Sequence, residues 1–157
     1  MKSILKNSIQ FYIDSEKIPD NLFAFKQFMF QETLMLSDEK PDISKINRVI
    51  GKVDLDEYKV INTSEGLSIE GRYMTGWQLV VTGEVKEKIE YVLDDEKQSV
   101  HIAYFSIPFS SYIILPEGYE NGQSLRVDGY IEDIYLEQID ARTIFNGVSI
   151  LINANFI

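Results

Sequence analysis

Residues 76–92 read GWQLVVTGEVKEKIEYV and alternate apolar with polar side chains along their whole length. One alternate set is apolar or glycine except at one position; it comprises Trp77, Leu79, Val81, Gly83, Val85, Glu87, Ile89 and Tyr91. The interleaved set is mostly polar. Successive side chains of a strand point to opposite faces. The pattern therefore predicts a long strand with one buried and one solvated face, or two collinear strands broken at Gly83.

Further strand-like runs fill the chain from Phe25 onwards. Residues 43–61 fit either a helical turn or a strand, and we favour a strand after Arg48. Residues 99–116 are apolar on both faces, which is typical of a strand covered on two sides. Pro108 lies inside this run and predicts an edge position or a bulge there.

Turn signals separate the runs. Pro41, the pair Asn121–Gly122 and the acidic residues 93–99 each predict a turn. The apolar set slips in phase after Ile131, which predicts a bulge near Asp133. About eight to ten short runs with hardly any helical period predict an all-β protein, an antiparallel β-sandwich.

The composition excludes several classes of function. The chain has 157 residues, enough for one domain, and 25 Asp and Glu against 15 Lys and Arg, for a net charge of −10. An acidic surface disfavours nucleic acid and anionic membranes. No cysteine is present, so disulfides and thiolate sites are excluded. No apolar run is long enough for a secretory signal or a membrane span, so we expect the product to stay in the cytoplasm of the producing cell.

Candidate chemical groups are few. His101 is the only histidine, and no serine, cysteine or acid at a known motif spacing accompanies it. Two acidic clusters could supply oxygen ligands to calcium, although solvated turns explain them better: Asp54, Asp56 and Glu57, and Asp94, Asp95 and Glu96. We therefore predict no enzyme, no catalytic residue, no cofactor and no metal.

Residues 1–24 form an N-terminal extension ahead of a domain that spans residues 25–157. Ile9, Phe11 and Ile13 alternate with polar or aromatic neighbours and predict a short strand. An extended arm of this kind can complete the sheet of a neighbouring copy, so these three residues are a candidate self-association arm. The alternatives are an ordinary edge strand on its own domain or a disordered tail.

The order of segments from Phe25 resembles that of the SPOCS domain family. The resemblance rests on an aromatic-rich strand leading into the KPDI turn at residues 40–43, and on the central strand of residues 75–92 followed by an IPF segment at residues 107–109. The closing run of residues 127–157, with its acidic loop and Arg142, is also similar.

This resemblance implies a non-enzymatic β-domain of endospore-forming bacteria, associated with assembly of the spore coat and envelope. Family members often carry several copies of the domain or a LysM module, and neither is present in this sequence. The resemblance therefore implies a small member that self-associates or binds other coat proteins, as a homo-oligomer in the spore surface layers.

A glycan-binding module of the cell or spore envelope is the alternative function. It requires exposed aromatic side chains on one face of the sandwich. The candidate glycan-facing residues are Tyr112, Tyr119 and Tyr130.

Overall fold

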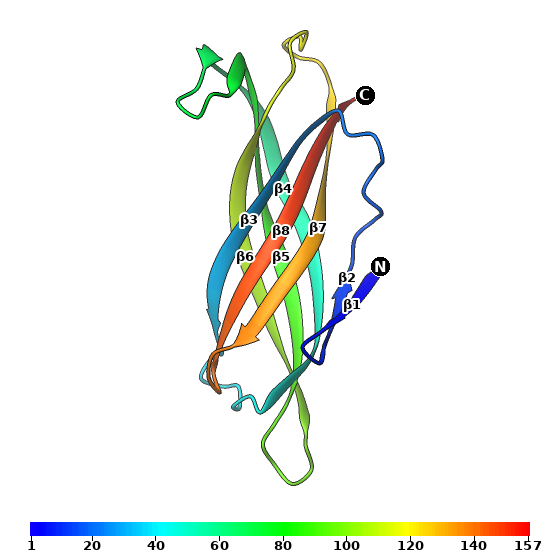
Figure 1. The fold of residues 1–157 in the computed structure, drawn as a ribbon, viewed down its shortest axis with the longest axis vertical. Helices are drawn as coiled ribbons and strands as arrows, with labels where there is room; N and C mark the ends of the chain where they lie inside the picture. The colour runs from blue at the N-terminus through cyan, green and yellow to red at the C-terminus, as the bar shows by residue number, and fades with distance from the viewer.

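The computed structural model describes residues 1–157 and contains eight strands in two sheets, packed face to face (Figure 1). The strands are β1 (Lys2–Lys6), β2 (Ile9–Ile13), β3 (Ala24–Met35), β4 (Lys45–Leu67), β5 (Tyr73–Val92), β6 (Val100–Ile114), β7 (Leu125–Gln138) and β8 (Thr143–Phe156). One sheet has the order β1-β2-β4-β5-β6 and the other β3-β8-β7. The predicted all-β sandwich is confirmed. Its pairings are antiparallel except that of β2 with β4.

β5 is one unbroken strand, and its apolar alternate set faces the other sheet. Leu79, Val81, Val85 and Ile89 have no exposed surface at all. Gly83 does not interrupt the strand. It lies opposite Leu55, where β4 has a bulge, and a Cβ at this position would lie only 2.6 Å from the main-chain oxygen of Asp54. The glycine therefore permits a close approach between two backbones.

β4 begins at Lys45, four residues before Val49, the expected start of the strand. A register shift between Ile46 and Arg48 places both Ile46 and Val49 on the buried face. An extra residue in a bulge changes the phase of the side chains along the strand. This phase change explains the helix-like spacing of Ile46, Val49 and Ile50 in the sequence, and residues 45–61 form a strand without a break.

Two expectations for residues 99–116 can be compared with β6: burial on both faces and an edge position for Pro108. The predicted burial on both faces is wrong, because Tyr104 and Tyr112 are exposed on the outer face while Ala103 and Ile107 are buried. β6 is the last strand of its sheet, so the predicted edge position of Pro108 is confirmed. Aromatic side chains on the solvated face made the run look apolar on both sides.

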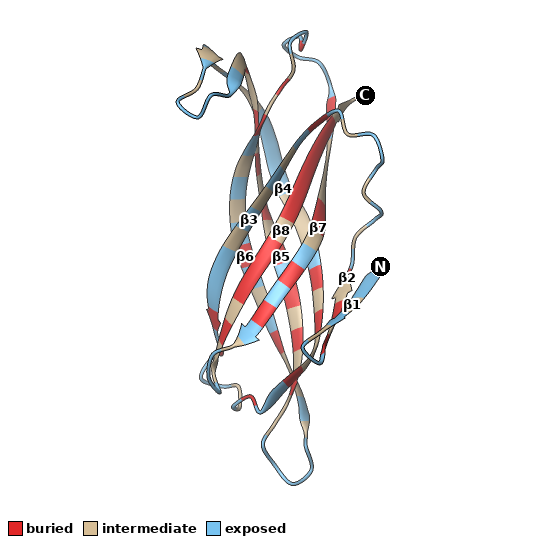
Figure 2. Ribbon diagram, in the orientation of Figure 1, coloured by how far each residue is buried: buried red, intermediate tan, exposed pale blue.

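The three-stranded sheet also follows the sequence signals. β7 has its bulge between Ile131 and Asp133, as predicted. The Asn121–Gly122 turn between β6 and β7 is also present, with Gly122 at a φ of +87°. β8 lies between β3 and β7 and is buried along most of its length (Figure 2).

Alanine substitutions at two strand glycines test the close approach between the backbones of β5 and β4 at Gly83. Gly83→Ala forces a Cβ against backbone that cannot move aside, so we expect it to lower the free energy of unfolding by about 1–3 kcal/mol. Gly147 is buried in β8, but a Cβ there would meet its nearest neighbour, the Cβ of Tyr135, at an ordinary 3.8 Å. Gly147→Ala should leave stability unchanged or raise it by up to about 1 kcal/mol. Urea unfolding measures the free energy of unfolding of both variants. Equal losses in the two would contradict a close backbone approach specific to Gly83.

Candidate functional site

The hairpin of β1 and β2, here called the arm (residues 1–13), is part of the hydrophobic core. The candidate arm residues Ile9, Phe11 and Ile13 lie in β2 and are 9%, 2% and 1% exposed. β2 pairs with β4 in parallel, from Gln10 opposite Arg48 to Ile13 opposite Gly51. The inward face of β2 therefore completes the packing of the sandwich beside β4.

The arm also covers the edge of β7. Lys2 Nζ donates a hydrogen bond of 3.4 Å to the main-chain oxygen of Glu132, and Lys6 Nζ donates one of 3.4 Å to that of Ile134. Lys6 also forms an ion pair with Asp133. These contacts lie at the β7 bulge, where ladder hydrogen bonding is interrupted. Exposed ion pairs contribute little, so apolar burial by β2 dominates the attachment of the arm.

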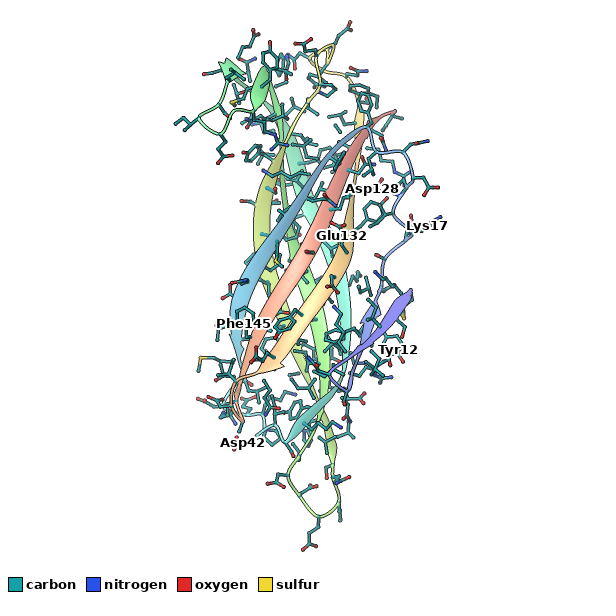
Figure 3. All side chains as sticks on the ribbon, in the orientation of Figure 1. Tyr12, Lys17, Asp42, Asp128, Glu132 and Phe145 are labelled. Atoms are coloured by element: carbon teal, nitrogen blue, oxygen red, sulfur yellow. The ribbon has the colours of Figure 1, made fainter.

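A linker of residues 14–23 joins the arm to β3. It runs beside β7 at the surface, where Figure 3 places Lys17 away from the sheets. The side chains of Lys17 and Asp20 are 87% and 88% exposed. None of residues 14–23 is buried, so the linker itself adds little to the attachment of the arm.

The three candidate glycan-facing tyrosines do not share one surface. Tyr112 is exposed on β6, and the Nζ of Lys26 lies 3.5 Å from its ring centre. Tyr119 is buried at one end of the sandwich, against Trp77 and Phe156. Tyr130 is also buried and lines a hollow with the linker residues Asp14 to Glu16; burial raises its pKa.

The other candidate chemical groups are dispersed. His101 is half-buried on β6 beside the ring of Tyr91. Asp54 is paired with Lys52 and Lys86, whose hydrogen bonds, chiefly that of Lys86, lower the pKa of its carboxyl. Asp95 accepts hydrogen bonds from Ser99 within the β5–β6 loop. No group of three or more acidic or histidine side chains could hold a metal ion, and no helix could span a membrane.

Arg142 fixes the KPDI turn to the loop between β7 and β8. Its guanidinium donates to the main-chain oxygens of Lys40 at 3.0 Å and Ser37 at 2.8 Å, and to the Asp42 carboxylate at 2.7 Å. The Tyr91 hydroxyl donates to the Pro41 oxygen at 3.0 Å. The planar fork of one arginine thus closes the end of the sandwich where Figure 3 labels Asp42.

Glu87 is the exception in the apolar series of β5, and it is buried in the core with 1% exposure. Neither of its carboxylate oxygens has a partner in hydrogen-bonding geometry, although the side chain of Asn146 in β8 lies near enough to oppose the rise in its pKa. Desolvation dominates and raises the pKa of Glu87 from 4.5 to about 7. No charged group contributes to this shift, so burial without a partner is its main cause.

The family model described as SipL, SPOCS domain, matches residues 42–139, more than half of the chain. The chain belongs to the SPOCS family. No curated protein and no solved structure matches it. The matched range begins inside the KPDI turn and ends in the loop that carries Arg142.

The SPOCS family is associated with spore coat and sporulation proteins and is generally non-catalytic. In this chain the sandwich extends beyond the matched range, because β8 lies outside it and yet pairs with both β3 and β7. The arm also lies outside it. Sequence reasoning found the inward residues of β2, but no signal indicated β1 or the contact of its lysines with β7.

Arg142→Lys tests the closing contact. A lysine keeps the charge but cannot donate to three acceptors in one plane, so we expect a loss of about 1–3 kcal/mol in the free energy of unfolding. Arg126→Lys is the matched control, because the Arg126 side chain is exposed and its one hydrogen-bonded partner is Asp128, two residues along the same strand. Its effect should stay within about 0.5 kcal/mol. Losses of the same size in urea unfolding would refute a special role for Arg142.

Glu87→Gln tests the cost of the buried, unpartnered carboxyl of Glu87. The unfolded chain ionises above pH 4.5, while the folded protein keeps the Glu87 proton until about pH 7. Stability contributed by this group therefore falls as pH rises through that window, by about 3 kcal/mol in all, and stays low above it. The variant should remove this fall and be the more stable protein at about pH 8. Urea unfolding across the window checks it, with the exposed Glu57→Gln as control; a wild-type profile in Glu87→Gln would disprove the account.

Proposed function

We propose that this SPOCS protein is a non-enzymatic assembly component of the spore coat or envelope, and that it acts by associating with copies of itself and with other coat proteins. The observation that carries the proposal is the arm on its linker. The core requires the buried face of β2, yet β2 is joined to the rest of the chain only by a surface segment.

The arm can reach a neighbouring copy. An extended chain covers about 3.3–3.6 Å per residue, so the linker of residues 14–23 spans roughly 30 Å. In an exchanged arrangement, β2 of one copy pairs with β4 of the next and makes the same contacts. Exchange of an identical element is a low-cost route to oligomers because few new contacts are needed.

Protein concentration decides between the two arrangements. A short tether keeps the arm of the same chain at an effective concentration of the order of millimolar. Exchange therefore competes only where the protein is crowded, as it is in a coat layer. Until then the arm protects the edges of β4 and β7 from irregular pairing. The glycan-binding alternative lacks comparable support, because Tyr119 and Tyr130 are buried.

A pair of introduced cysteines tests exchange. Tyr12 and Ile50 are paired across β2 and β4, and the chain has no cysteine of its own. In the variant Tyr12→Cys with Ile50→Cys, an exchanged arm gives a disulfide between chains and a retained arm gives one within a chain. We expect the interchain fraction on non-reducing electrophoresis to rise with protein concentration.

The control is Lys88→Cys with Tyr104→Cys, a surface pair across the β5–β6 hairpin that must stay within one chain. Light scattering of the wild-type protein gives the mass independently. Disulfides within the chain at every concentration would eliminate arm exchange. A monomeric mass over the whole range as well would eliminate self-association itself.

A further inference from the structure

The β4–β5 hairpin projects beyond the sandwich as a two-stranded ribbon, at the upper left in Figure 1. The last pair between β5 and β6 is Gln78 with Ile114, so residues 62–76 have no third strand beside them. Leu67 pairs with Tyr73 at its end. Isolated two-stranded hairpins are at best marginally stable in water. The ribbon of residues 62–76 has no third strand, so it adds little to the stability of the core.

The tip of this hairpin, residues 65–70, exposes apolar side chains. Leu67 is 77% exposed and Ile69 is fully exposed. Glu65 and Glu70 flank them, and neither takes part in an ion pair of the chain. The tip is therefore an apolar projection with an unpaired negative charge on each side.

A hollow of complementary character lies next to the tip. Its volume is about 440 Å³. Its apolar lining comes from Phe23, Phe25, Ile114 and Pro116, and its positive charge from Lys26 and Arg72. Phe23 and Phe25 are about half exposed there. Its two charged residues are both cations, on a chain of net charge −10, and neither has an acidic partner in the chain.

We propose that the tip of one copy inserts into the hollow of a second copy, and the reverse, to form a symmetric contact. Leu67 and Ile69 pack against the exposed phenylalanines, and Glu65 and Glu70 meet Lys26 and Arg72. Opposite charges around an apolar centre fix the orientation of such a contact and disfavour other partners. This inference rests on the proposed self-association and assigns it a surface separate from the arm.

The position of Arg72 explains why the contact would form a closed dimer of two copies. Arg72 belongs to the turn that carries the tip and also lines the hollow, so the two halves of the contact are neighbours on one surface. A surface that holds both complementary parts side by side can meet its own copy about a two-fold axis. The tip contact therefore gives a dimer and does not by itself propagate.

Cross-linking of single-cysteine proteins tests the contact. Ile69→Cys and a mass-tagged Phe25→Cys are mixed and oxidised, each with one cysteine because the chain has none. We expect the mixed disulfide to exceed that of Ile69→Cys with Tyr104→Cys by about tenfold, through the higher effective concentration at a docked site. Tyr104 is 72% exposed on β6 and serves as the matched surface position. Equal yields overturn the proposal.

Charge reversal provides the second readout. Glu70→Lys brings a lysine against Lys26 and Arg72 of the other copy, and we expect the dissociation constant from sedimentation to rise by at least about tenfold. Adding Arg72→Glu should restore part of the affinity. Glu96→Lys, in the exposed β5–β6 loop, makes the same change in charge and should leave it unchanged.

The outcomes separate the two proposals. If the wild-type protein self-associates and Glu70→Lys behaves like Glu96→Lys, the tip contact is refuted and the arm remains as the route of assembly. If the wild-type protein is a monomer at every concentration, both proposals fall. Loss of association in Glu70→Lys with recovery by Arg72→Glu supports the tip contact specifically.

Discussion

The inward face of β5 sets the constraint on which the rest of the structure depends. From Leu79 to Tyr91 its apolar side chains have no exposed surface, so the neighbouring elements are arranged to exclude water from them. β4 and β6 cover the edges of β5 with main-chain hydrogen bonds, and the three-stranded sheet covers its inner face. Burial of apolar surface is worth about 25 cal/mol per Å², so this face of β5, together with the buried side chains of β8 opposite, contributes much of the packing energy of the core.

This constraint also explains the exceptions within β5. Gly83 is tolerated because the bulged backbone of β4 occupies the space of its side chain. Glu87 is tolerated because a protonated carboxyl can be buried at moderate cost, and its raised pKa records that cost. Arg142 acts at a distance from β5 but serves the same end, since it ties the KPDI turn over the end of the core.

Local patterns predicted most of the fold, because alternation and turn residues are local signals. The phase slip after Ile131 located the β7 bulge, and Pro108 located an edge. Local patterns could not show that β2 joins β4 in parallel, since pairing depends on segments far apart in the chain. They also could not show that Tyr130 is buried, because the linker residues beside it come from outside its own sheet.

The two proposed contacts lie on different parts of the molecule, and this separation has a consequence for assembly. The arm lies on one side of the sandwich, whereas the hairpin tip lies at the end that Figure 1 draws uppermost. Reciprocal arm exchange and reciprocal tip insertion each close as a dimer about its own two-fold axis. A chain that uses both joins two different neighbours, so the copies alternate between the contacts and form an extended array. Each contact alone stops at a dimer, and only their combination builds a continuous linear chain of copies.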